Sequence, residues 1–213
     1  MKRLFYLGFT AILALVLSGC GGGGDSRTIF VAQIFSDQPT DGDIALDRVL
    51  QTFTITQGPN TLFFGIDELD PNLPEFRAFL DFPLDGSTGQ DVVPADAVIV
   101  SATLEVTVVE VSFATVVPTL IELIRYPISG LTQGDFDSDP LASRALDFLS
   151  SDVNLPAIAI DVTPLMLEAQ RLGLLDFQVR FLLDFVPNAF GIVGIDDRPT
   201  VALTAPLLTV EFH

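Results

Sequence analysis

The 213-residue chain contains no tryptophan, a single cysteine, Cys20, and a single histidine, His213. With one cysteine, no disulfide can form within the chain, so the fold has to be stabilised by packing. Because the only histidine is the last residue, Ser-His-Asp catalysis, Cys-His catalysis and histidine-rich metal sites are all disfavoured. No glycine-rich phosphate loop follows an expected strand and opens a helix. These absences predict a protein that is not an enzyme.

Basic residues are scarce as well. The chain has 10 lysine and arginine residues against 28 aspartate and glutamate residues, and without Lys2 and Arg3 its formal net charge is −20. Such a field repels nucleic acid and anionic membrane surfaces, so we expect no nucleic-acid partner. The chain is nevertheless 49% hydrophobic and contains 18 phenylalanines, which is enough material for a packed core.

The N-terminal segment predicts export and lipid attachment. Lys2-Arg3, an apolar run over residues 4–17 and the small pair Ser18-Gly19 have the layout of a signal peptide. The run is shorter than the about 20 residues of a membrane-spanning helix, which makes a transmembrane anchor the weaker alternative. The segment Leu17-Ser18-Gly19-Cys20 resembles the lipobox of bacterial lipoproteins. This resemblance implies that residues 1–19 are removed and that Cys20 is lipidated and held in the membrane by several acyl chains.

The residues after Cys20 predict a tether and a location. Residues 20–28 are rich in glycine and form a flexible spacer, so that one domain is expected over residues 29–213. Gly21 follows the cysteine, in place of the aspartate that is associated with inner-membrane retention in enteric bacteria. We therefore expect a lipid-anchored protein of the bacterial outer membrane or cell surface.

Alternating runs predict an all-β fold, namely an antiparallel jelly-roll β-sandwich with one short helix packed across an end. Residues 75–82, 97–108 and 174–185 alternate most clearly, and a helix is expected from Thr163, which can cap it, to Gly173, which can end it. Further strands are expected at residues 48–57, 61–66, 117–127, 157–162, 190–195 and 206–212. The residues predicted to point inward from the two longest runs are Val98, Val100, Ala102, Leu104, Val106, Val108, Leu175, Phe177, Val179, Phe181, Leu183 and Phe185.

Five segments carry a resemblance to a known family. "TLFFGID", "EFRAFLDFPL", "VPADAVIVSATLEVTV", "AIDVTPLMLEAQRLGLLDFQVRF" and "PLLTVEF" occur in this order within residues 48–213. They resemble the bacterial and archaeal DNRLRE-type domain, a jelly roll related to carbohydrate-binding modules. The resemblance implies non-catalytic binding of polysaccharide or cell-envelope glycan, although the tryptophans that this family carries near its helix are missing here.

A structural or assembly subunit that contacts other envelope proteins is the alternative function. Phe79 and Leu182 lie on otherwise polar strand faces, where they mark either a contact patch or a covered sheet. Arg77 and Arg180 lie on these faces near Asp81 and Asp184, and surface ion pairs are expected for them.

The acidic segment "GDFDSDP" is the candidate metal site. Asp135, Asp137 and Asp139 have the spacing that begins an EF-hand loop, so calcium is the cofactor that this pattern allows. The match then fails, because position 6 is Pro140 and position 12 is Leu146. Three other acidic clusters are alternative calcium sites: Asp41-Gly42-Asp43, Asp67-Glu68 with Asp70, and Asp196-Asp197. Each cluster can also be interpreted as a solvated acidic turn. Carboxylate pairs could serve a glycosidase, but sequence cannot place two at a working separation.

The lipobox resemblance makes a direct prediction about the mature N-terminus. Mass spectrometry of the membrane fraction should show an acylated peptide that begins at Cys20, and residues 1–19 should be absent. Retention of Met1, or an unmodified Cys20 in soluble protein, would contradict the anchor.

Overall fold

The computed structural model describes residues 28–87, 91–187, 189–198 and 204–213. The predicted signal peptide and Cys20 lie outside these residues, as does all of the tether except its last residue. The strands are β1 (Phe30–Phe35), β2 (Gly42–Asp47), β3 (Thr52–Gln57), β4 (Thr61–Ile66), β5 (Glu75–Pro83), β6 (Ile99–Val106), β7 (Val108–Ser112), β8 (Val116–Leu123), β9 (Ala142–Leu149), β10 (Ile158–Asp161), β11 (Asp176–Leu183), β12 (Gly191–Asp196) and β13 (Leu207–Phe212). The helical elements are α2 (Thr163–Arg171) and the 3-10 turns η1 (Gln133–Asp135) and η2 (Asp152–Asn154).

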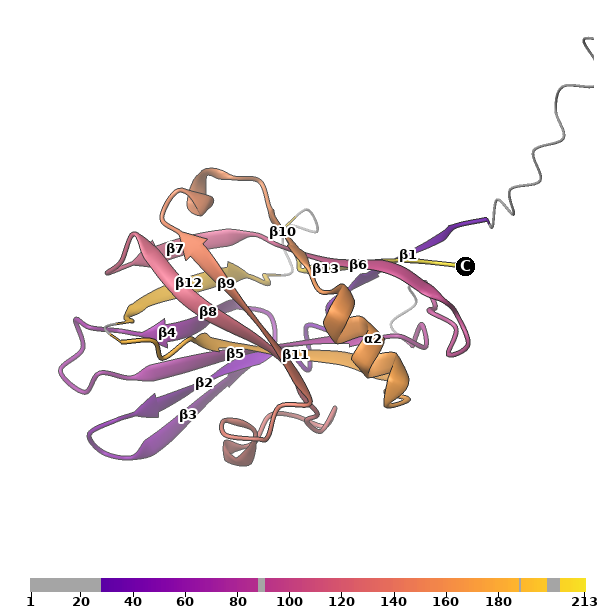
Figure 1. Ribbon diagram of the computed structural model, residues 1–213. Coiled ribbons are helices and arrows are strands. Elements are labelled where there is room, and N and C mark those ends of the chain that lie inside the picture. Colours follow the sequence, from indigo (N-terminus) through magenta and orange to yellow (C-terminus); the bar gives the residue numbers. More distant parts are fainter. Residues whose placement is uncertain (1–27, 88–90, 188, 199–203) are drawn as a thin grey trace, which may run out of the picture.

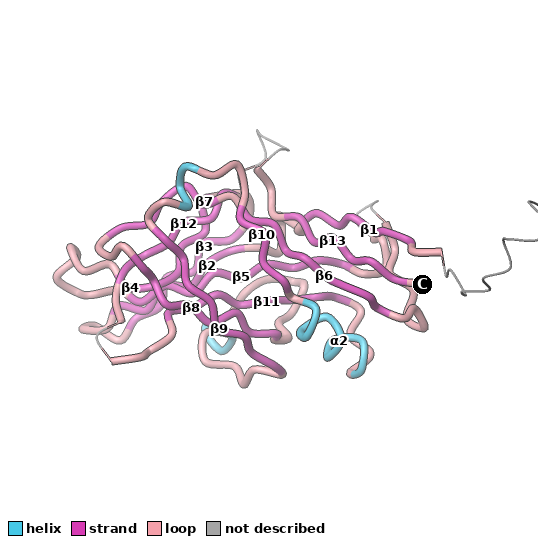
Figure 2. Tube along the Cα trace, turned by 45° about the horizontal axis from the view of Figure 1, so that its top comes forward, coloured by secondary structure: helices cyan, strands magenta, loops and turns pink. Residues whose placement is uncertain are grey.

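Two antiparallel sheets pack against each other as a sandwich (Figures 1 and 2). The four-stranded sheet has the order β1-β13-β6-β10. The larger sheet has the order β7-β12-β4-β5-β11-β8-β9, and β2 joins it by pairing with β5 and carries β3 at its other edge. The predicted all-β sandwich with one short helix is therefore confirmed.

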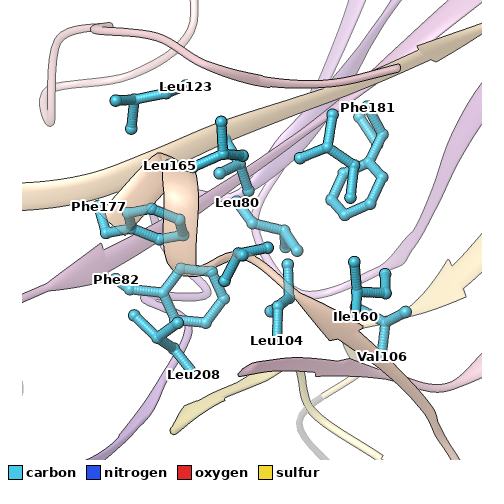
Figure 3. Packing of buried hydrophobic residues seen from close by; sticks show 14 of the residues in the cluster. Leu80, Phe82, Leu104, Val106, Leu123, Ile160, Leu165, Phe177, Phe181 and Leu208 are labelled. Atoms are coloured by element: carbon cyan, nitrogen blue, oxygen red, sulfur yellow. The ribbon is translucent and has the colours of Figure 1, made fainter. Parts of the chain in front are cut away.

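One hydrophobic core fills the space between the sheets and beneath α2. Figure 3 shows Leu104 and Leu208 of the smaller sheet gathered with Phe82 and Phe177 of the larger one. The ring of Phe181 lies 5.5 Å from that of Phe64, measured between centroids. The inward residues that were predicted correctly are Ala102, Leu104, Val106, Val108, Phe177, Val179, Phe181 and Leu183.

The prediction was wrong at the ends of the two long runs. A register shift between Glu211 and Phe212, opposite the start of β6, buries Ile99 and leaves Val98 and Val100 exposed. Such a bulge changes which face successive side chains occupy. At the other run, Leu175 and Phe185 lie beyond the ends of β11 and are exposed, by 71% for Leu175.

Helix α2 begins and ends near the predicted positions and closes the core beside β6. Its buried residues are Leu165, Met166 and Ala169. Thr163 does not cap the helix, because its hydroxyl accepts a hydrogen bond from the Ala102 amide at 2.9 Å and so ties the helix to β6. Among the described helices, none has the length and apolar character needed to cross a membrane.

The outer face of the larger sheet is covered by a second, smaller core. The connection between β8 and β9, residues 124–141, folds back over β5 and β11 and places Tyr126, Leu131 and Phe136 against Phe79. Both Phe79 and Leu182 are buried, so the covered-sheet alternative is the correct one for them.

Two substitutions, one within β11 and one just before it, test the register. Phe181→Ala should lower the free energy of unfolding by about 3–5 kcal/mol, because it empties a packed site in the main core. Leu175→Ala should change it by about 0.5 kcal/mol or less, because that side chain is exposed. Denaturant melts measure both, and equal losses would contradict the assigned faces.

Candidate functional site

The segment predicted to bind calcium is organised by an arginine. From β11, the guanidinium of Arg180 donates hydrogen bonds to the carbonyl oxygens of Asp135 at 2.8 Å, Phe136 at 2.7 Å and Ser138 at 2.9 Å. The Arg180 side chain is buried and also pairs with Glu122 of β8. Three backbone oxygens thus converge on a positive charge that the protein itself supplies.

A second arginine reinforces the same loop from β5. The Arg77 guanidinium pairs with Glu75 at 2.8 Å and with Asp137 at 3.0 Å, and it donates a hydrogen bond to the Phe136 carbonyl. Its Cζ lies 3.9 Å from the centre of the Phe136 ring, within the range of a cation–π contact.

The surface ion pairs expected with Asp81 and Asp184 are therefore wrong for both arginines. Because residues 124–141 cover this face, Arg77 and Arg180 are buried, and a buried charge needs close partners.

The three aspartates of this loop have different partners. Asp135 Oδ2 accepts hydrogen bonds from the Thr132 amide at 2.7 Å and the Thr132 hydroxyl at 2.8 Å. Asp137 pairs with Arg77 and has a side chain that is 77% exposed, and Asp139 is exposed. Over the described ranges, no group of three or more histidine, cysteine, aspartate or glutamate side chains could hold a metal ion. The calcium prediction for Asp135, Asp137 and Asp139 thus still depends on their spacing alone.

A different set of carboxyl groups is buried where the two sheets meet. Asp41 precedes β2, Asp197 follows β12, and both are fully buried. Ser36, directly after β1, donates its hydroxyl hydrogen to Asp197 Oδ1 at 3.3 Å and also neighbours Asp41. Asp41 Oδ1 accepts a hydrogen bond from the Asp81 amide at 2.7 Å, whereas Asp41 Oδ2 and Asp197 Oδ2 have no hydrogen-bond partner in the part of the chain that the structure describes.

Burial dominates the electrostatics of this pair. It raises the pKa of Asp197 to about 7, and it raises the pKa of Asp41 well above the usual value, with the charge of Asp197 as the next cause. The two carboxyl groups therefore lie close together, and burial disfavours a negative charge on both of them at once.

Asp81 and Tyr126 continue this acidic region. Asp81 Oδ2 accepts a hydrogen bond from the Thr40 hydroxyl at 3.1 Å, and the Gln178 side chain also neighbours this carboxyl group. Asp81 Oδ1 and the Tyr126 hydroxyl have no hydrogen-bond partner of normal geometry among the described residues. Burial, followed by the charge of Asp176, raises the pKa of Asp81 to about 7. Burial also raises the pKa of Tyr126, and the charge of Asp41 is the next cause of this shift.

The interpretation of these aspartates as solvated turns was wrong. Asp41, Asp43 and Asp196-Asp197 are buried, and burial raises the pKa of Asp43 to about 6. Only the cluster around Asp67 behaves as a turn, because Asp67 Oδ1 accepts a hydrogen bond from the Leu69 amide two residues on.

An open hollow lies at one end of the sandwich, between two connections of the larger sheet. It has a volume of about 440 Å³ and is lined by Phe113, Ala114, Thr115, Val116, Pro118, Val186, Pro187, Ala189 and Phe190. The ring of Phe190 is partly exposed, and Phe113 has a φ angle of 69°, which is strained for a bulky residue. Gly191 lets the two connections meet, because a Cβ there would lie 2.8 Å from Val117 Cγ2.

A second hollow of about 330 Å³ lies beside the end of α2. It is lined by aliphatic residues such as Val93, Met166 and Leu174, and it contains no aromatic ring. The amide of Gln170, its central polar group, is already bound to the Ala97 carbonyl at 2.6 Å. This hollow therefore offers packing surface but few free polar groups.

The chain matches no protein-family model and no curated protein. The function of these sites therefore has to be inferred from their own geometry.

Arg180 lies under residues 124–141, the loop that covers the outer face of β5 and β11, and its replacement tests how much this arginine stabilises the fold. Arg180→Ala should lower the free energy of unfolding by about 3–5 kcal/mol, because it leaves Glu122 buried without its partner. Arg180→Lys should retain only part of the stability, since an ammonium cannot reproduce the fork of hydrogen bonds.

Arg171→Ala is the matched control. Its side chain is 68% exposed and pairs within α2, so the loss of stability should be much smaller than for Arg180→Ala. Equal losses for Arg180→Ala and Arg171→Ala would show that the loop is not held by Arg180.

Proposed function

We propose that this chain is an exported, lipid-anchored surface protein whose β-sandwich binds polysaccharide or cell-envelope glycan without catalysis. The hollow between residues 113–118 and 186–190 is the binding site in this proposal. The observation that carries it is the presence of two phenylalanines, Phe113 and Phe190, in an open cavity of about 440 Å³. Aromatic rings in an accessible hollow offer flat apolar surface, which sugar rings can stack on.

The backbone of Phe113 supports a functional role for this hollow. A φ angle of 69° costs a bulky residue stability of the order of 1–3 kcal/mol, and such strain concentrates at ligand-binding positions. Neighbouring contacts fix the conformation: Thr115 accepts a hydrogen bond from the Ser150 amide at 3.0 Å, and Pro118 accepts one from the Asp184 amide at 2.8 Å.

The position of the hollow also suits a surface protein. In Figures 1 and 2, β1 begins and the chain ends at one extremity of the sandwich, and the connections at β7 and β12 lie at the other. An anchor at Cys20 would precede β1, so the hollow would face away from the membrane. The negative charge of the chain fits an uncharged or cation-bridged glycan better than nucleic acid.

The buried acids favour a non-catalytic role. A glycosidase needs two carboxyl groups beside its substrate, at a separation that matches its mechanism. The neighbouring carboxyl groups described above, Asp41 with Asp197 and Asp81 with Asp176, do not line the hollow, and none of its described lining residues is acidic.

Assembly with other envelope proteins remains the second candidate, because β1 is an edge strand with exposed apolar side chains. Phe30, Val31 and Phe35 are exposed, and the ring of Phe30 stacks on that of Phe212 at 5.9 Å between centroids. Free edges of this kind pair readily with strands of other chains. Sedimentation velocity of wild-type protein and Val31→Lys tests self-association, which the charged variant should abolish.

A glycan array on the purified protein, followed by titration of any hit, tests the binding proposal. Phe190→Ala should lower the affinity for the captured glycan by about tenfold, which corresponds to about 1.4 kcal/mol. Phe113→Gly should also weaken glycan binding, because it removes the ring. It should change the free energy of unfolding less than the free energy of binding, because glycine adopts a positive φ angle without strain.

Phe185→Ala is the matched control, because Phe185 belongs to the same connection and is exposed but does not line the hollow. It should leave the affinity unchanged. The proposal fails if no glycan is retained on the array, or if Phe185→Ala and Phe190→Ala weaken binding equally.

A further inference from the structure

The buried carboxyl groups at the junction of the two sheets lack a counter-charge. Among the described residues, the only buried side-chain polar atoms without a hydrogen-bond partner are Asp41 Oδ2, Asp81 Oδ1, Asp197 Oδ2 and the Tyr126 hydroxyl. None of these three aspartates takes part in an ion pair within the described ranges, and the nearby Arg198 is engaged by Asp196 at 2.6 Å.

Buried polar atoms in native proteins are almost always satisfied, by protein, water or a bound ion. Two of these atoms, Asp41 Oδ2 and Asp197 Oδ2, belong to neighbouring carboxyl groups, so either a proton or a cation has to lie between these two groups. Tyr126 is an independent indication, because its hydroxyl comes from the covering loop and is buried near Asp41 and Asp81 without a bond.

The charge of the Asp41–Asp197 pair identifies the partner. One shared proton would neutralise one carboxylate and leave the other charged in the interior. A divalent cation would neutralise both, and it would use the two oxygens, Asp41 Oδ2 and Asp197 Oδ2, that have no partner. Both ligands are carboxylate oxygens, which hard cations prefer.

We propose that Asp41 and Asp197 form a calcium site, with the Ser36 hydroxyl and water completing the ligand set. Only two acidic side chains supply ligands, which agrees with the finding that no three of them converge among the described residues. Calcium tolerates such mixed ligand sets, whereas magnesium demands near-ideal octahedral geometry.

The backbone around the pair explains what the ion would do. The Ser36 amide bonds to the Pro206 carbonyl at 3.0 Å, ahead of β13 in the smaller sheet. The Asp197 amide bonds to the Asn60 carbonyl at 3.0 Å, ahead of β4 in the larger sheet. An ion between Asp41, Asp197 and Ser36 would therefore fasten the two sheets together and stabilise the folded state by mass action.

Equilibrium dialysis of the purified, chelator-treated mature protein in detergent tests the site directly. At about 1 mM free calcium, a concentration typical of extracellular modules, we expect one bound calcium per chain and a higher melting temperature. Magnesium, and sodium chloride at the same ionic strength, should raise the melting temperature less. A wild-type protein that binds no calcium under these conditions overturns the proposal.

Substitution of either aspartate by asparagine tests whether the ion binds at this pair. Asp197→Asn and Asp41→Asn should each weaken calcium binding by at least about 100-fold, because removal of a direct ligand exceeds the loss seen for supporting residues. Both variants should fold, since each removes a buried charge that has no partner, and in chelator they should melt at or above the wild-type temperature.

Asp137→Asn is the matched control and should retain calcium binding. Loss of binding in Asp137→Asn with retention in Asp197→Asn would place the ion in the loop at residues 135–139 and overturn the proposal. A wild-type protein without calcium, combined with a stabilised Asp197→Asn at neutral pH, would identify the pair as two carboxyl groups that share a proton.

Discussion

The burial of Arg180 is the constraint on which one whole face of this protein depends. A guanidinium under the covering loop has to be surrounded by oxygen atoms, and the loop supplies the carbonyls of Asp135, Phe136 and Ser138 while β8 supplies Glu122. Residues 124–141 are thereby fixed over β5 and β11, which lets the apolar side chains of the loop pack on Phe79. Strands β5 and β11 are thus buried on both faces although their sequences alternate like those of half-exposed strands.

This arrangement explains which parts of the fold could be predicted. Alternation identifies β6 and β11 and their core-facing residues, because a side chain's face within a strand is a local property. What lies over the opposite face is not local: alternation predicts that Arg180 and Gln178 face solvent, yet a connection that starts at residue 124 buries them. Four strands were missed for related reasons. β9 is an edge strand whose side chains are exposed or half-buried, and β7 follows β6 almost without a break. β1 also exposes most of its side chains, and β2 contains a glycine and two aspartates, which are depleted in strands.

The candidate sites also divide into features that are local in the sequence and features that only the fold reveals. An i, i+2, i+4 aspartate pattern points to residues 135–139, but there the positive charge that organises the carbonyls comes from arginine. Five of the seven described arginines form ion pairs, and none of these pairs includes Asp41, Asp81 or Asp197. The distribution of a few basic residues over many acidic ones therefore decides which carboxylates are compensated. The imbalance is visible in the composition, but only the fold shows that the uncompensated acids lie together in the interior.

The shape of the open hollow depends on the strands that hold the backbone of Phe113 in place. Phe113 keeps a left-handed backbone only because the surrounding strands hold it: β7 and β12 pair on one side of the turn, and β8 pairs with β9 and β11 on the other. A Cβ at Gly191 would lie 2.8 Å from Val117 Cγ2 and 3.1 Å from Ala114 Cβ, so this glycine lets the start of β12 approach the chain directly after Phe113. A strained residue that its neighbours hold in one conformation loses little further conformational entropy on binding, which would favour the weak stacking contacts of the proposed glycan site. Because the chain contains no tryptophan, stacking at that site would have to rely on Phe113 and Phe190.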